Sequence, residues 1–478
     1  MNTAVITSPT LSHEAEAVAV RIFASQRAAH RKSPVPSLES RRRNLKTLER
    51  LLLDNQDDIC RAICQDFGNR AHQETKLLEL FLSVDGIRDC HKRLAKWIKP
   101  QSRKGSIWFL GARNTVIPQP KGIVGVVAPW NYPLFLVMGP VTSALAAGNR
   151  CMVKMAANSR NLCVLLQRLV AQHFDEETLA IVPGVSGSFF SNMPFDHLIF
   201  TGSADTGRQV MRAASDNLTP VTLELGGKSP VIVAGDFDLK IAAERILQMK
   251  TVNAGQTCVA PDYVFVREDQ VATFVQHCRA TASQRYPSLQ TTDYTSIIDQ
   301  HAYDRLMGYF DDATGKGARV INLLPGNISS ETACKIAPAL VVGVDDNMRV
   351  MQEEIFGPIL PIKTYRTLDE VIDYINDRDQ PLALYLFTNN RQVQEQVVSF
   401  TQSGGVAIND CGLHVAQHDL PFGGIGASGM GHYHGYEGFV EFSKLRPIFK
   451  QFFRPAFPLL YPPYGALFDR LIKLMLGR

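Results

Sequence analysis

The sequence contains no Cys-x-x-Cys pair, so neither a zinc knuckle nor a thioredoxin-type redox site is supported. Its nine cysteines are odd in number and scattered along the chain. Free thiols in a reducing compartment fit this pattern best. A cytoplasmic location is therefore predicted.

Charge of one sign is also scarce, because 50 basic and 46 acidic residues leave a net charge of only +4. The densest basic run, Arg41 to Arg43, lies in a helical pattern and has no aromatic residues between its charges. A solvated helix face is predicted there rather than a nucleic-acid surface. No nucleic-acid partner is expected.

Targeting and membrane segments are lacking as well. The N-terminus has no basic start followed by an apolar run, which argues against a secretory signal and a transit peptide. One uncharged stretch, residues 122–148, has the length of a membrane span. Its prolines at 129, 133 and 140 favour a buried strand, a turn and a buried helix instead. No integral membrane span is predicted.

The remaining pattern is a regular alternation of strands and helices. A chain of 478 residues is long enough for two or three domains. Residues 14–99 are helical in pattern, and a second α/β unit follows Lys228 and continues to about residue 409. Between them, near-continuous apolar strands are expected at 122–129, 150–156, 179–185, 197–203 and 220–225. This alternation predicts an α/β fold with parallel sheets, which bind ligands at the carboxyl ends of their strands.

One cysteine stands in unusual surroundings. The segment NAGQTCVAPDYV (253–264) places Cys258 among small residues, whereas a packing cysteine usually sits among larger apolar ones. Small neighbours allow other backbone or a ligand to approach the sulfur. Cys258 is therefore a candidate nucleophile.

Two polar side chains at predicted strand ends are candidate partners for this thiol. Glu224 lies near the end of the strand PVTLEL and is well placed as a base; a helix cap or a partner for Lys228 is the less favoured alternative. Asn131 follows another strand and can donate to a developing oxyanion. Its alternative role is the N-cap of the next helix.

The turn TGSADTG carries Gly202, Ser203 and Gly207 between a strand and a helix. Free backbone N–H groups at such a position suit a pyrophosphate. The turn lacks the G-x-G-x-x-G spacing, so an ordinary tight turn remains the alternative.

The stretches PWNYPL, FTGSADTGRQVM, LELGGKSP, NAGQTC, QEEIFGPILP and PFGGIGASGMGHYHG occur in this order along the chain. With them the sequence resembles the aldehyde dehydrogenase superfamily over nearly its whole length. CVAPDYV and PLALYLFTNN make it most similar to the class 3-like branch, and particularly to bacterial coniferyl aldehyde dehydrogenases. The resemblance implies an aldehyde dehydrogenase fold: a Rossmann-like parallel-sheet cofactor domain, an α/β catalytic domain and a small β oligomerisation element.

The resemblance also implies an activity, the NAD(P)-dependent oxidation of a hydrophobic or aromatic aldehyde to a carboxylic acid. Cys258 as a thiolate would attack the aldehyde, and sulfur suits this step because it later leaves well from a thioester. The Asn131 amide and the backbone N–H of Cys258 would hold the oxyanion. The thiohemiacetal would give a hydride to nicotinamide, and Glu224 would activate water to hydrolyse the thioester.

The cofactor implied is NAD or NADP. Where the family commonly reads Lys-Pro-Ser-Glu, this chain reads KMAA (154–157), so Ala157 replaces an acid that would repel a 2′-phosphate. We therefore expect both cofactors to be used. The resemblance assigns these cofactor contacts: Trp130, Lys154, Gly202, Ser203, Gly207, Glu354 and Phe356.

The resemblance divides the chain into four parts. It assigns 14–105 and 120–225 to dinucleotide binding, 226–431 to catalysis, 106–119 and 438–450 to oligomerisation strands, and 451–478 to a C-terminal extension. Because such strands extend a neighbouring subunit's sheet in the family, a homodimer is expected. The apolar face of the last helix, from about Ala466, is expected to cover the partner or the substrate entrance rather than a membrane.

Other readings stay open at this point. A medium- or long-chain aliphatic aldehyde is an alternative substrate, and release of an acyl-CoA or a thiol esterase without redox chemistry are alternative activities. A non-catalytic relative is disfavoured because the nucleophile, base and amide are all present. No metal is expected, since the following histidines are predicted to lie on the surface or in turns: His414, His418, His432 and His434.

Overall fold

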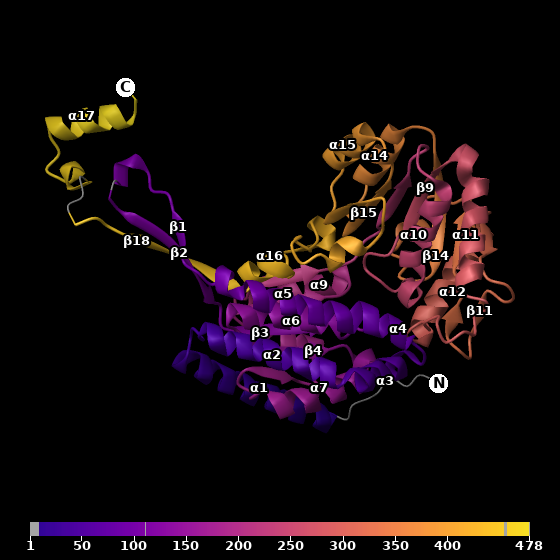
Figure 1. Ribbon diagram of the computed structural model, residues 1–478, viewed down its shortest axis with the longest axis horizontal. Coiled ribbons are helices and arrows are strands. Elements are labelled where there is room, and N and C mark those ends of the chain that lie inside the picture. Colours follow the sequence, from indigo (N-terminus) through magenta and orange to yellow (C-terminus); the bar gives the residue numbers. More distant parts are fainter. Residues whose placement is uncertain (1–8, 110, 454–456, 478) are drawn as a thin grey trace.

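The computed structural model describes residues 9–109, 111–453 and 457–477, so the first eight residues of the predicted signal-free N-terminus lie outside it. Two α/β lobes form the body, and a long arm projects from the first lobe (Figure 1). Within the described residues, no helix combines the length and the apolar character needed to cross a bilayer.

The first lobe is built on a six-stranded sheet of order β17-β7-β6-β3-β4-β5. All neighbours run parallel except the short β17. The strands are β3 (Ile123–Ala128), β4 (Arg150–Met155), β5 (Leu179–Ile181), β6 (His197–Thr201), β7 (Val221–Glu224) and β17 (Gly429–Met430). Every residue of β3 is buried, as expected for a sheet covered on both faces. The parallel sheet predicted from the apolar strands is confirmed.

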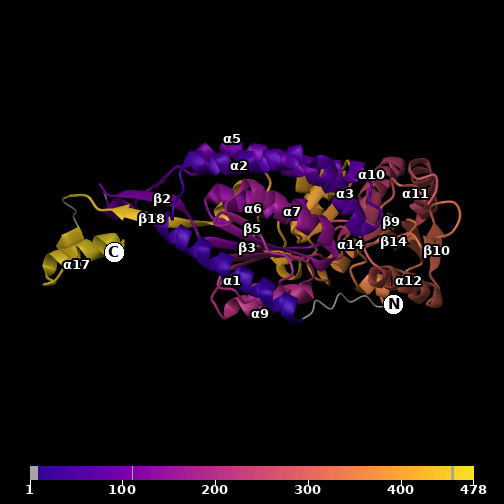
Figure 2. The same ribbon diagram turned by 90° about the horizontal axis from the view of Figure 1, so that it is seen from below.

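Helices cover both faces of this sheet (Figure 2). One apolar core joins the sheet to α2 (Leu38–Asp54), α3 (Gln56–Phe67), α5 (Leu82–Trp97), α6 (Phe135–Ala147) and α7 (Arg160–His173). A second core joins the other face to α1 (Pro9–Lys32), α8 (Gly187–Ser191) and α9 (Ala204–Ser215). The uncharged stretch 122–148 is therefore the buried strand β3, a turn and the buried helix α6, as predicted.

The second lobe contains a seven-stranded sheet of order β10-β13-β14-β9-β8-β15-β16. Its strands are β8 (Pro230–Val233), β9 (Tyr263–Arg267), β10 (Arg319–Asn322), β13 (Ala339–Val342), β14 (Ile359–Tyr365), β15 (Ala383–Phe387) and β16 (Gly405–Ile408). A two-stranded ribbon pairs β11 (Ser329–Ser330) with β12 (Lys335–Ile336). The helices are α10 (Leu239–Thr251), α11 (Val271–Arg285), α12 (Gln300–Gly315), α13 (Arg349–Gln352), α14 (Leu368–Asn376) and α15 (Arg391–Phe400).

The arm is a three-stranded antiparallel sheet of β1 (Gln101–Arg103), β2 (Arg113–Pro120) and β18 (Ser443–Lys450). Two details differ from the predicted strands 106–119 and 438–450. Residues Ile107–Phe109 form a 3-10 turn at the tip, and Gly435–Glu441 form the helix α16 on the body. Phe439 of α16 is buried in the core of the body, so the helix belongs to the body, and the strand of the arm begins only after it.

The basic run at Arg41 differs from its prediction. Arg41 is buried, and its Nη1 donates to the carbonyls of Ala146 and Ala147 at the end of α6, at 3.1 and 2.9 Å. The guanidinium thus satisfies carbonyl groups that a helix end leaves without partners. Only Arg43 of the triplet is exposed, so the prediction of a solvated face is wrong for Arg41.

A π-helix, η1 (Lys76–Phe81), interrupts the run between the short α4 (His72–Thr75) and α5. It directs Glu79 inward, where Oε2 accepts hydrogen bonds from the backbone N–H of Leu134 at 2.6 Å and of Phe135 at 3.2 Å. The carboxylate therefore caps α6, whose orphan N–H groups favour an anion. It also pairs with Arg70 at 2.8 Å, with both side chains fully buried.

We expect Arg70→Met to destabilise the protein by about 3–5 kcal/mol, because it leaves the Glu79 carboxylate buried without its partner. Urea denaturation of the two proteins measures the difference. Arg208→Met is the matched control, since Arg208 and Asp205 form an exposed pair whose loss changes little. Equal unfolding midpoints for the two variants would show that the buried pair contributes no more than the exposed one.

Candidate active site

The predicted nucleophile lies on a turn between α10 and β9. Residues Val252–Gly255 form a tight turn in which Asn253 and Ala254 have positive φ angles of 50° and 52°. Gly255 is required there, because a Cβ at that position would lie 2.4 Å from the carbonyl oxygen of Gly357. The small residues around Cys258 thus allow neighbouring backbone to approach, which is one of the two explanations that the sequence left open.

Buried amides hold this turn in place. The side chain of Gln256 donates to the carbonyls of Asn253 and Ser296 at 2.9 and 3.0 Å, and its Oε1 accepts from the backbone N–H of Ile298 at 3.0 Å. Gln256 and Asn253 are fully buried. The segment that carries Cys258 is therefore fixed by hydrogen bonds and not only by packing.

The thiol and the predicted base face each other. Cys258 Sγ lies 3.9 Å from Oε1 of Glu224, the last residue of β7, which lies between β17 and β6 in the first lobe's sheet. Thr201 Oγ1 donates to the other carboxylate oxygen at 3.3 Å. Lys228 pairs with Asp262 instead, so Glu224 is neither a helix cap nor the partner of Lys228.

The surroundings make Glu224 a base at neutral pH. Burial raises the pKa of its carboxyl to about 7, although Tyr433, Thr201 and Cys258 favour the ionised form. Burial also raises the pKa of the Cys258 thiol above its usual value, and the charge of Glu224 adds to this effect. The backbone N–H groups of Cys258 and Val259 act in the opposite direction. A carboxylate within reach is therefore suited to accept the thiol proton.

Asn131 lies beside the same turn. Its side-chain Nδ2 donates to the backbone carbonyl of Gln256 at 3.2 Å. Its backbone carbonyl accepts from the side chains of Arg70 at 2.9 Å and Asn253 at 3.0 Å. The alternative role as an N-cap is excluded, because Glu79 caps α6. The buried Asn131 amide therefore bonds the residue that lies two positions before Cys258.

An apolar cavity of about 270 Å³ leads to the thiol. Cys258, Glu224, Tyr132, Thr257 and Tyr433 are its polar lining residues, and the rest of the wall is apolar. The apolar residues come mainly from η1, α5, α6 and the 412–422 loop: Leu77, Leu78, Phe81, Leu82, Phe135, Leu136, Met249, Val252, Val259, Leu413, Val415, Ala416 and Phe422. Leu77, Phe81 and Leu413 are more than half exposed, and they form an apolar rim.

A second cleft of about 500 Å³ opens at the carboxyl ends of β3, β4 and β6. Trp130, Lys154, Gly202 and Ser203 line it together, as predicted for a nucleotide site. Ser203 Oγ caps α9 by accepting from the N–H of Thr206 at 3.4 Å. Burial lowers the pKa of Lys154. The cleft thus combines a helix N-terminus with one ammonium group, a combination that suits phosphate and ribose.

Glu354 and Phe356 lie in a neighbouring part of this region. Glu354 lines a cleft of about 540 Å³ with Gly226 and Gly227, and a Cβ on Gly226 would lie 2.3 Å from its carboxylate. Burial raises the pKa of Glu354 to about 8. The ring of Phe356 meets that of Trp130 edge-on at 5.5 Å, so Phe356 lies against a residue that lines the other cleft.

Gly207, like Phe356, is a predicted cofactor residue that does not line these clefts. It is buried in α9, where a Cβ would lie 2.8 Å from Leu225 and 3.7 Å from Phe200. The glycine therefore lets α9 approach the sheet. Its place in the structure is a packing contact.

The prediction of histidines on the surface or in turns fits His432, which is exposed, and His418, which lies in a turn, whereas His434 is buried. His434 is buried and stacks on Phe422 at 4.9 Å, and His414 lies between the rings of Phe422 and Tyr385. Burial lowers the pKa of both histidines. No group of three or more potential metal ligands occurs in the described part of the chain.

Sequence reasoning missed Tyr433 and Thr201, both of which contact the base. Tyr433 lines the same cavity as Glu224 and lowers the pKa of that carboxyl, while its hydroxyl has no hydrogen-bond partner among the described residues. Tyr433 stands in the motif GHYHG, but no local signal distinguishes it from its neighbours. Thr201 is the first residue of the TGS turn, and the sequence pattern marks it only as the end of a strand.

Comparison with known proteins agrees with this geometry. Residues 2–448 match the aldehyde dehydrogenase family. A probable coniferyl aldehyde dehydrogenase of Pseudomonas aeruginosa is 47% identical over 460 residues, 96% of each chain. The substrate-bound structure of Staphylococcus aureus AldH superposes with a TM-score of 0.90 at 34% identity, over 95% of this chain and 99% of that one. An NAD⁺ complex of an aldehyde dehydrogenase from Bacillus cereus superposes with a TM-score of 0.79 at 26% identity, over 87% of this chain and 84% of that one. This chain belongs to the aldehyde dehydrogenase family.

Proposed function

We propose that this protein oxidises hydrophobic or aromatic aldehydes to carboxylic acids with NAD or NADP, through a covalent intermediate on Cys258. The observation that carries the proposal is the thiol–carboxylate pair, 3.9 Å apart, at the end of an apolar cavity beside a nucleotide-sized cleft. The similarity to a probable coniferyl aldehyde dehydrogenase supports it.

The first half of the reaction forms the covalent bond. Glu224 takes the thiol proton, and the sulfur attacks the aldehyde carbon, so a C–S bond forms as the carbonyl becomes an oxyanion. The Asn131 amide and the backbone N–H of Cys258 stabilise that oxyanion. The apolar wall excludes water during this step, which strengthens both interactions.

The second half releases the acid. When bound, the nicotinamide cofactor accepts the hydride that the thiohemiacetal loses, which leaves a thioester on Cys258. Glu224 first releases the thiol proton and then takes a proton from water, whose oxygen adds to the thioester carbonyl. The C–S bond breaks and the acid leaves. Release of the free acid rather than an acyl-CoA follows from the presence of this base.

The residues present fit a nicotinamide dinucleotide. The cleft lies at the carboxyl ends of parallel strands, where such cofactors bind, and α9 directs its N-terminus into it. Lys154 would reach the adenosine ribose and Trp130 would flank the site. Gly202 and Ser203 would meet the pyrophosphate, and Glu354 with Phe356 would position the nicotinamide half. A cofactor cleft of this kind disfavours the esterase reading.

The first test is reduction of the cofactor by the purified protein with cinnamaldehyde-type and aliphatic aldehydes, each with NAD and NADP. We expect reduction with both aldehyde classes and faster turnover of the more hydrophobic members, because the cavity wall is apolar. A preference for medium- and long-chain aldehydes would favour the aliphatic alternative. No reduction with any pair would overturn the proposal.

Ala157 leads to a separate expectation about the cofactor. We expect wild-type kcat/KM values for NAD and NADP to agree within about tenfold, or about 1.4 kcal/mol. Ala157→Glu should lower kcat/KM for NADP at least about tenfold relative to NAD, because the carboxylate repels a 2′-phosphate. Ala157→Gln, of equal size but neutral, is the control. A strong wild-type preference for NAD would contradict the expectation.

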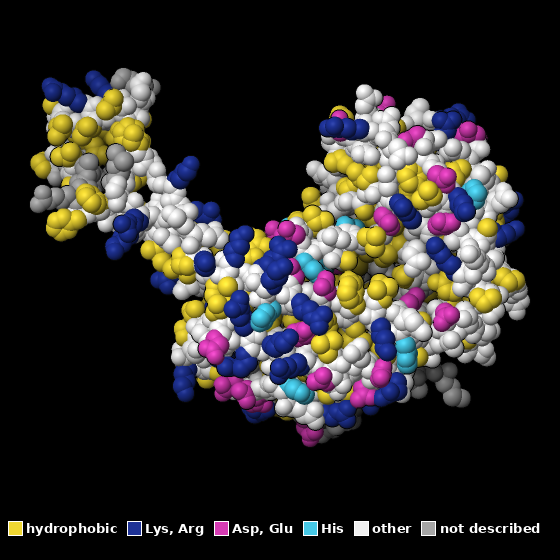
Figure 3. Space-filling model, viewed as in Figure 1, with side chains coloured by type: hydrophobic (Ala, Val, Ile, Leu, Met, Phe, Trp, Pro, Cys, Tyr) yellow, Lys and Arg dark blue, Asp and Glu magenta, His cyan; other side chains and the backbone are white. Residues whose placement is uncertain are grey.

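We also propose that the protein is a homodimer assembled through the arm. β18 is an edge strand of the arm over eight residues, and edge strands readily pair with another chain. The helix at its end, α17 (Ala466–Met475), has no buried residue in the described structure and carries apolar side chains on its surface (Figure 3). A ten-residue helix is marginal alone in water, so a partner surface would stabilise it.

A further inference from the structure

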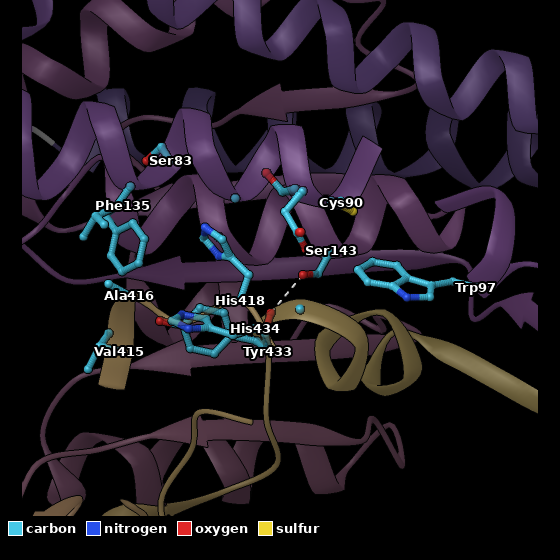
Figure 4. Close-up of a pocket in the computed structure, with 16 residues that line it drawn as sticks. Ser83, Cys90, Trp97, Phe135, Ser143, Val415, Ala416, His418, Tyr433 and His434 are labelled. Carbon is cyan, nitrogen blue, oxygen red and sulfur yellow. Dashed lines mark hydrogen bonds between the residues drawn. The ribbon is translucent and has the colours of Figure 1, made fainter. Parts of the chain in front are cut away.

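A small cavity of about 40 Å³ lies behind the active site, between α5, α6 and the segments 415–418 and 433–435 (Figure 4). Three of its lining residues carry buried polar atoms without a hydrogen-bond partner among the described residues: Ser83 Oγ, Tyr433 Oη and His434 Nε2. Burying such an atom is unfavourable unless water satisfies it. A cavity of this volume holds about two or three water molecules. We call it the water chamber.

The water chamber adjoins the apolar cavity. The two share a wall of five residues: Leu82, Phe135, Val415, Ala416 and Tyr433. Tyr433 is the only one of these five with a polar side chain, and it lines the apolar cavity together with Glu224. Ser143 Oγ fixes the backbone of Tyr433 by donating to its carbonyl at 2.8 Å. Tyr433 therefore lies between the cavity that contains Glu224 and the water chamber.

The other end of the chamber reaches the protein surface. His418 lies against Gly86 of α5, where a Cβ would be 3.8 Å from its Nδ1. Its Nε2 lies 2.9 Å from Asp85 Oδ2, and the Asp85 side chain is 49% exposed. Nδ1 of the imidazole therefore lies beside Gly86 on the chamber wall, and Nε2 contacts a surface carboxylate. Asp85 itself does not line the chamber, and the acid that does, Asp89, is held by Arg93 at 2.8 Å.

Glu224 needs such an outlet because each turnover leaves it with a proton. Its side chain is buried, and the cavity in front of it is apolar and holds the acyl group during hydrolysis. We propose that Tyr433 and the water chamber carry this proton from Glu224 to His418 and Asp85 at the surface. The inference rests on the proposed function of Glu224 as the hydrolytic base.

The transfer balances at every step. The proton on Glu224 moves to Tyr433 Oη while the Tyr433 hydroxyl proton moves to a chamber water. That water passes a proton to His418 Nδ1, and the proton on Nε2 leaves to Asp85 and then to solvent. Tyr433 and the water end unchanged, Glu224 is ionised again, and no oxidant or reductant is required.

Tyr433→Phe tests the proposal, because it removes only the unpartnered hydroxyl and keeps the ring. The readout is hydrolysis of p-nitrophenyl acetate, which acylates the thiol without cofactor and whose first and later turnovers separate acylation from deacylation. We expect a burst of normal size followed by deacylation slowed about ten- to hundredfold. Tyr436→Phe is the control, since Tyr436 bonds Gln101 at 3.0 Å outside both cavities, and it should behave as wild type.

His418→Ala gives a second readout that a purely structural role would not produce. Deacylation should slow, and added imidazole should restore it, because a small base can take the place of the lost side chain in the chamber. Deacylation at the wild-type rate in Tyr433→Phe, or no rescue by imidazole in His418→Ala, would overturn the relay. If the wild type hydrolyses the ester but reduces no cofactor, the proposed oxidation fails while this test of the relay still stands.

Discussion

Replacing Cys258 by serine is expected to lower kcat/KM for aldehyde oxidation by at least about 10³-fold, as loss of a nucleophile does in other covalent enzymes. A serine hydroxyl is far less acidic than a thiol, so Glu224, with a pKa of about 7, cannot ionise it to a useful extent. Oxygen is also a poorer leaving group from the acyl intermediate. Cofactor reduction with a saturating aldehyde measures the loss.

A matched control separates chemistry from folding in this experiment. Cys334 is another half-buried thiol of the second lobe, and it lines neither the apolar cavity nor the nucleotide-sized cleft. Cys334→Ser should keep wild-type turnover, and circular dichroism should show the same fold for both variants. If Cys258→Ser retained more than about a hundredth of the wild-type rate, a nucleophilic role for Cys258 would be untenable.

The parts of the structure that could be predicted are those that short-range sequence patterns specify. Strands such as 122–128 read as continuous apolar runs because both faces of the sheet are covered, and the polar residues that follow them lie at one edge by topology. That is why Asn131, Glu224 and the TGS turn could be singled out. The thiol could be singled out because its neighbours are small.

The parts that could not be predicted depend on contacts between distant segments. Arg41 looks like a surface residue until its helix is packed against the end of α6. Tyr433 contacts Glu224 only after β17 has paired with β7, which brings the 429–435 segment to the base. The predicted strand 438–450 begins as the helix α16, because Phe439 and Phe442 pack into the core of the body. Composition near these residues gives no sign of such contacts.

Glu224→Gln is expected to lower steady-state turnover by about 10²–10⁴-fold, the range in which a positioned base contributes. The amide cannot accept a proton from the thiol or from water. In the wild type, burial places the pKa of this carboxyl at about 7, so the base is mostly protonated below that pH. Turnover should therefore fall about tenfold per pH unit below about 7 and reach a plateau above it. The inflection should be absent in Glu224→Gln.

Thr201→Val distinguishes this assignment from any other group that titrates near neutrality. Its hydroxyl donates to Glu224 at 3.3 Å and lowers the pKa of that carboxyl, so its removal should move the inflection to higher pH. Valine keeps the shape of the side chain, and the plateau above the new pKa should change little, because the ionised base is still present. An inflection that stayed in place in Thr201→Val, or that survived in Glu224→Gln, would mean that the titrating group is not Glu224.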